Sequence, residues 1–195
     1  MNPHLRSSGC RFSLRMLGVL CSLAMAGEAT VLAENEIPPP DRSPRTTDAE
    51  PNNPSVPAVY SLSTNFERIV VLRIKKDEDL LGGLKAGVLK EGISNAVILS
   101  GIGSLTSFHI HAVSNTTFPS TNAFLKGEKH PCDITSVQGY VVDGRIHSHV
   151  SLADADKAFG GHLEPGSNIF TYAIVTLGVL PKNQDLKRFD DKTWR

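Results

Sequence analysis

Short runs rich in β-branched and aromatic residues recur between residues 66 and 180 of the chain, separated by turn residues. Such runs predict β-strands. The predicted strands cover residues 66–74, 96–100, 107–113, 134–142, 145–152 and 169–180. Asp143-Gly144 stands between two of them and is a favoured two-residue hairpin turn, so we expect those two strands to pair antiparallel. The last run is apolar on both faces, which predicts a central strand or one covered by another subunit.

One stretch among these runs has the periodicity of a helix instead. Residues 77–91 begin with acidic side chains and continue with leucines and valine at helical spacing, and Gly92 follows. Gly82 and Gly83 weaken this helix by about 1 kcal/mol each relative to Ala, so we expect close packing against a neighbour there. One main helix with a mostly antiparallel sheet predicts the α+β class.

The beginning of the chain predicts export. Three arginines precede an apolar run of eleven residues, 16–26. This pattern is typical of a signal peptide spanning residues 1–26, with cleavage as late as residue 33 as a second candidate. We therefore expect a periplasmic or secreted protein with no stable membrane span, because eleven apolar residues are too few to cross a bilayer. The alternative is an unstructured cytosolic tail with an apolar stretch by chance.

A proline-rich segment separates this leader from the rest. Residues 34–58 contain seven prolines and almost nothing apolar, which predicts a disordered linker. Residues 60–195 then remain as one domain of comfortable size. The arginines at 41–48 lack the Gly-Arg-Pro core of an AT-hook, a minor-groove DNA-binding motif.

Charge and cysteine content restrict the partners. The chain has 20 basic and 20 acidic residues, and loss of the leader removes three basic and no acidic ones, which leaves a net charge of −3. Non-specific nucleic-acid binding depends on basic side chains, so nucleic acid is not an expected partner. Cys132 is then the remaining cysteine, and it cannot form an internal disulfide. We expect it to be buried, the alternative being a thiol available to a partner.

Histidines suggest the chemistry. His147 and His149 alternate in a predicted strand, so their side chains point to one face about 7 Å apart. His162 follows Gly160-Gly161, where missing side chains allow a close approach of backbones. If residues 153–161 fold back as a hairpin, His162 approaches His149 and completes a three-histidine cluster suited to a divalent metal such as zinc.

Further residues are candidates for the same pocket: His109, His111, Asp154, Arg145, Gly101 and Gly103. His109 and His111 form a second His-x-His pair, which could join the cluster or form its own site. Asp154 could orient an imidazole or ligate directly. Arg145 could hold an anionic ligand or simply face solvent. The glycines of Ser100–Ser104 favour a tight turn, with an anion-binding pocket wall as the alternative.

Residues 64–192 resemble the PPC ("plants and prokaryotes conserved") domain family. The most specific marks are Ser100–Ser104, the His147-x-His149 pair and Gly160-Gly161-His162-Leu163. The resemblance implies a sandwich-like α+β domain on an antiparallel sheet, assembled as a homotrimer. Prokaryotic members are often labelled DNA-binding proteins, a label that descends from the AT-hooks of plant members. This chain lacks the hook, and His109 and His111 stand where less polar or aromatic residues are expected.

The sequence therefore predicts an exported, self-assembling binding module whose histidine pocket takes a divalent metal or a small ligand, without catalysis. One alternative is the DNA-binding, regulatory role of the family label. Another is a metal-dependent enzyme that acts on a small substrate through a bound water. The simplest alternative is that the histidines are packed polar residues of a pocket or subunit interface, each satisfied by a hydrogen bond.

Overall fold

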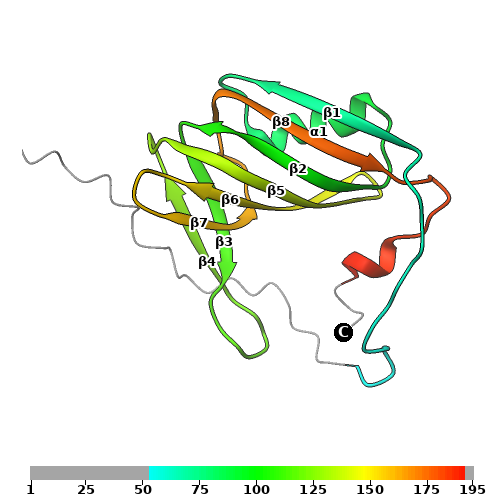
Figure 1. The fold of residues 1–195 in the computed structure, drawn as a ribbon. Helices are drawn as coiled ribbons and strands as arrows, with labels where there is room; N and C mark the ends of the chain where they lie inside the picture. The colour runs from blue at the N-terminus through cyan, green and yellow to red at the C-terminus, as the bar shows by residue number, and fades with distance from the viewer. Residues whose placement is uncertain (1–52, 192–195) are drawn as a thin grey trace, which may run out of the picture. The chain divides into compact units, whose positions relative to one another are not determined.

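The computed structural model describes residues 53–191. The predicted signal peptide and all but the last residues of the predicted linker lie outside this range. The described residues form an eight-stranded sheet in the order β1-β8-β2-β5-β6-β7-β3-β4 (Figure 1). Every neighbouring pair is antiparallel. The strands are β1 (Arg68–Lys75), β2 (Ala96–Leu105), β3 (Phe108–Val113), β4 (Asn122–Gly127), β5 (Cys132–Val142), β6 (Arg145–Ala153), β7 (Ala158–Leu163) and β8 (Ile169–Val179).

The predicted class and the predicted hairpin are confirmed. One α-helix, α1 (Leu80–Lys90), accompanies the antiparallel sheet. Strands β5 and β6 pair through the turn at Asp143 and Gly144, whose φ angles of 50° and 74° are those that this hairpin turn requires. Strand β8 is an interior strand, second from the edge of the sheet and paired with β1 and β2. Strands β4 and β7 are not predicted, because both contain glycine and few β-branched residues.

The prediction of a tight turn at Ser100–Ser104 is wrong, because these residues lie inside β2. A Cβ on Gly101 would stand 2.5 Å from the Cβ of Val137, and one on Gly103 would stand 2.5 Å from the carbonyl oxygen of Tyr172. The two glycines therefore let β2 pack closely between β5 and β8. Their role in the fold is the close packing of these strands.

Helix α1 covers one face of the sheet (Figure 1). The Asp79 carboxylate caps its first turn by accepting from the backbone N–H of Gly82 at 2.7 Å. Leu80 and Leu84 are fully buried against the sheet. A Cβ on Gly83 would stand 2.5 Å from Cγ2 of Ile74, which confirms the expected close packing at this glycine. No helix within residues 53–191 is long and apolar enough to cross a membrane.

The opposite face of the sheet exposes large apolar side chains over β1, β8, β2 and β5. We call this set the apolar face: Ile69, Val71, Leu99, Ile102, Tyr140, Phe170 and Tyr172. Val71 is 63% exposed and Ile102 is 58% exposed, although both occupy regular strand positions. Exposed apolar side chains gathered on neighbouring strands are typical of an interaction surface.

Candidate metal centre

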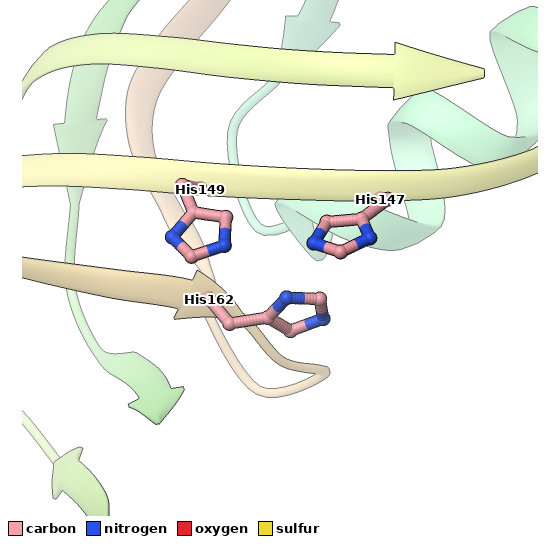
Figure 2. A group of neighbouring side chains, drawn as sticks. All are labelled: His147, His149 and His162. Carbon is pink, nitrogen blue, oxygen red and sulfur yellow. The ribbon is translucent and has the colours of Figure 1, made fainter. Parts of the chain in front are cut away.

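Three imidazoles meet on the face of the sheet opposite helix α1. Strands β6 and β7 pair antiparallel with His149 directly opposite His162, and His147 lies two residues before His149 on the same face. Figure 2 shows the three rings gathered beside the two strands. One potential ligand atom from each ring lies within 4.8 Å of the other two. The hairpin on which this convergence depends, β6 with β7, is present.

The spacing of the rings fits a single ion. The ring centroids lie 4.9 Å apart for His147 and His162, 5.3 Å for His149 and His162, and 5.6 Å for His147 and His149. Two imidazoles bound to one tetrahedral zinc at ordinary Zn–N distances have centroids about 5 Å apart. The centroid distances are therefore compatible with one ion shared by the three rings.

Two glycines make this register possible. A Cβ on Gly160 would stand 2.5 Å from the carbonyl oxygen of Val150 on β6, and one on Gly161 would stand 2.4 Å from the carbonyl oxygen of His111 on β3. These are backbone atoms, which cannot move without opening the sheet. Strand β7 therefore fits between β6 and β3 only with glycine here, and His162 follows directly.

Of the second His-x-His pair, His111 joins the cluster and His109 does not. His111 is paired with His162 across β3 and β7, and their rings stack with centroids 4.5 Å apart. His111 Nδ1 donates to Glu164 Oε1 at 2.7 Å, and His111, His162 and Glu164 form a second group of potential ligands. His109 Nδ1 instead donates to the carbonyl oxygen of Pro165. Its buried Nε2 has no hydrogen-bond partner among the described residues.

A carboxylate from the C-terminal segment reaches the cluster. His147 Nδ1 donates to Asp190 Oδ1 at 3.2 Å, which leaves Nε2 as the nitrogen with a free lone pair. Asp190 ends the 3-10 helix Lys187–Asp190 and also pairs with Arg145 at 3.4 Å. Arg145, expected to hold an anion or to face solvent, has a side chain that is 65% exposed and that pairs with this carboxylate of its own chain.

Asp154 belongs to a different part of the molecule. Its carboxylate accepts from the backbone N–H groups of Asp156 and Lys157 in the turn between β6 and β7, and from Nε2 of the buried His130. The backbone hydrogen bonds, followed by that of His130, lower the pKa of Asp154 to about 2. Asp154 therefore fastens the turn and lies in neither ligand group.

The single described cysteine is structural. Cys132 is free and 6% exposed, which confirms the expected burial. Burial, and then the nearby Asp154 and Asp133 carboxylates, raise the pKa of its thiol to about 11. A thiol held protonated in this way is a poor nucleophile and a poor metal ligand at neutral pH.

The environment keeps the central imidazoles neutral. Burial, and then the neighbouring His111, His147 and His149, lower the pKa of His162 to about 4. Burial and the adjacent His147 and His111 also lower the pKa of His149 below its usual 6.5. A metal binds the unprotonated ring, so these two side chains are ready to ligate even in mildly acidic solution.

A recess opens beside the cluster. Its volume is about 630 Å³, and its walls include His147, His149, Tyr140, Leu99 and Phe189. An apolar hollow with imidazoles at one side has the character of a small-ligand site.

The model of the Plants and Prokaryotes Conserved (PCC) domain, the family abbreviated PPC above, matches residues 61–181. The chain belongs to this family. The match spans all eight strands and helix α1 of the PPC domain.

Solved structures share the fold of this PPC domain. A PPC protein of Pyrococcus horikoshii is 29% identical, with a TM-score of 0.52, over 65% of this chain and 87% of its own. The metal-containing protein AF0104 of Archaeoglobus fulgidus is 23% identical, with a TM-score of 0.56, over 70% of this chain and 96% of its own.

A curated relative of this PPC domain is far longer than the chain. The bifunctional protein GlmU of Synechococcus sp. (strain JA-3-3Ab) is 28% identical over 117 residues, which are 60% of this chain and 18% of the relative. The similarity therefore concerns less than a fifth of that protein.

Lower pH should destabilise the metal-free PPC domain. Because the pKa of His162 is about 4 in the folded chain and near 6.5 when unfolded, the unfolded chain binds more protons between these values. The free energy of unfolding should be highest above pH 6.5, where His162 is neutral in both states. It should fall as the pH decreases toward 4. Urea unfolding of chelator-treated protein at pH 7 and at pH 5 measures this change in stability. The urea concentration at the unfolding midpoint should be lower at pH 5. In His162→Gln the difference should shrink, and an equal difference in both proteins would contradict the assignment.

Proposed function

We propose that this chain is an exported, self-assembling PPC binding module that holds a divalent metal ion on His147, His149 and His162. The observation that supports it is the meeting of three imidazoles from two adjacent strands at ligand spacing. A lone histidine on a strand is usually a packed polar residue. Three rings on one face, two of them kept neutral by their surroundings, are better explained by an ion.

The chemistry of the donors favours zinc. Neutral imidazoles suit borderline metals such as zinc, copper and nickel, whereas calcium and magnesium prefer oxygen ligands. Three imidazoles leave a fourth tetrahedral position for water or a small ligand. The adjacent recess provides room for such a ligand. The similar fold of an archaeal protein described as metal-containing is consistent with this proposal.

Self-assembly is supported by the apolar face. Its side chains are exposed in the isolated chain, and covering them with further copies would remove them from water. A homotrimer is the assembly that the family resemblance implies, and we propose it for this chain.

The open fourth position also sets the test for an enzyme. A metal-bound water there could hydrolyse a small substrate, and turnover abolished by a chelator would establish that role in place of simple binding. The DNA-binding label of the family has less support, because the chain has no excess of basic residues to neutralise phosphates.

Metal binding is the first outcome to measure. Elemental analysis of the purified chain should find a bound divalent ion, and a chelator should lower the melting temperature, since an ion that binds only the folded state stabilises it. His147→Ala and His149→Ala should each weaken zinc binding more than about 100-fold, because loss of an outer-sphere partner alone costs 10–100-fold. His109→Ala, on the same face but in neither ligand group, is the matched control and should bind normally. Absence of any bound ion would refute the proposal.

The mass of the protein in solution tests the proposed homotrimer. Sedimentation equilibrium should give three times the mass of the chain. Val71→Asp or Ile102→Asp, which place a charge on the apolar face, should shift the chain toward the monomer. Leu89→Asp is the control, because Leu89 is 82% exposed on helix α1, on the other side of the sheet, and should leave the mass unchanged. A monomeric unmodified chain would contradict the assignment.

Export is tested by cell fractionation. The chain should accumulate outside the cytoplasm in a form shortened by about the length of its leader. Deletion of residues 16–26, the apolar run, should retain the protein inside the cell. Recovery of the uncleaved chain in the cytoplasm would show that the N-terminal segment is not a signal peptide.

A further inference from the structure

We propose a second cation position next to the first, formed by His111, Glu164 and the other ring nitrogen of His162. The domain then holds two divalent ions that share His162. This inference rests on the proposed function, because the second position uses a ring that already serves the first. The two ligand groups, His147 with His149 and His162, and His111 with His162 and Glu164, have that one member in common.

The register of three strands creates the second group. His149 is opposite His162 across β6 and β7, and His162 is opposite His111 across β7 and β3. The three rings therefore form one row across the sheet, with His162 in the middle. Glu164 lies two residues after His162, just past the end of β7, and its contact with His111 places its side chain on the same face.

The donor atoms of the second group are already close. His111 Nδ1 and Glu164 Oε1 are 2.7 Å apart, and the ligand atoms of all three residues lie within 4.8 Å of one another. Two ligands of one tetrahedral zinc are separated by about 3.3 Å at ordinary bond lengths. An ion can therefore replace the shared hydrogen once the carboxylate moves slightly outward and the His162 ring, which stacks on His111, turns its second nitrogen toward the same point. The His111 proton then resides on Nε2, so this ring stays neutral.

His162 can serve two ions because the two nitrogens of an imidazole flank one carbon and direct their lone pairs away from each other. Figure 2 shows one nitrogen of His162 turned toward the rings of His147 and His149 and the other turned away. The first ion uses one lone pair of the neutral ring. The second ion binds the other nitrogen, whose N–H proton passes to solvent, and the ring becomes an imidazolate bridge between two dications.

Charge explains why the second position has a carboxylate. Two dications on opposite sides of one ring repel each other, and Glu164 places a negative charge beside the second ion. The side chains of His111 and Glu164 are only 18% and 24% exposed, so solvent screens this attraction less than at an open surface. We expect sequential binding, with the second ion at least about 10-fold weaker because of the remaining repulsion.

The experiment is a zinc titration of the metal-free, purified full-length chain, followed by calorimetry and checked by elemental analysis after equilibrium dialysis. We expect two ions per chain with separate affinities. Glu164→Gln preserves shape but removes the ligating charge, and His111→Asn removes the imidazole, so each should bind one ion with nearly unchanged first affinity. His109→Asn, on the same strand and face as His111, should still bind two. Circular dichroism confirms that each variant is folded.

The possible outcomes distinguish failure of the second cation position from failure of the proposed function. No bound zinc in the unmodified chain would refute the proposed function and this inference together. A single ion that Glu164→Gln leaves unaffected would keep the proposed function and overturn the second position. A single ion that Glu164→Gln weakens would also overturn it, because His111 and Glu164 would then belong to one centre.

Discussion

The placement of β7 between β6 and β3 is the constraint on which the histidine cluster depends. Gly160 and Gly161 permit it, because a side-chain carbon at either position would collide with the backbone of a neighbouring strand. Once β7 is inserted, the antiparallel register brings His162 between His149 and His111. The glycines thus act on the chemistry indirectly, by letting two strands approach a third closely enough for imidazoles to meet.

Successive side chains of a strand point to opposite faces of the sheet, so buried core residues and exposed histidines lie on different faces. In β6, His147 and His149 turn their imidazoles outward, while Ser148 and Val150 are buried on the side of helix α1. The same alternation in β1, β8, β2 and β5 leaves an apolar face beside the histidines. The proposed assembly surface and the proposed metal centre therefore occupy one side of the domain, so association and ion binding can influence each other.

Much of the cluster could be predicted because it follows from local periodicity. His147 and His149 had to share a face if their run formed a strand, and the Asp143-Gly144 turn indicated the hairpin that holds it. The double glycine before His162 indicated a close approach without identifying its partner. Glu164 could have been found by extending the same alternation two residues past His162. Asp190 could not, because more than 40 residues separate it from His147 and only the returning C-terminal segment brings them together.

The sequence by itself determined the class of the fold, the division of each strand into buried and exposed faces, and the residue types available for a metal. These are short-range properties, carried by spacing along the chain. The tertiary structure alone decided that Gly101 and Gly103 lie within a strand, that His111 joins the cluster while His109 does not, and that Asp154 fastens a turn. Those outcomes depend on which strands are neighbours and in what register. That choice is made by packing between segments far apart in the chain, which local patterns do not encode.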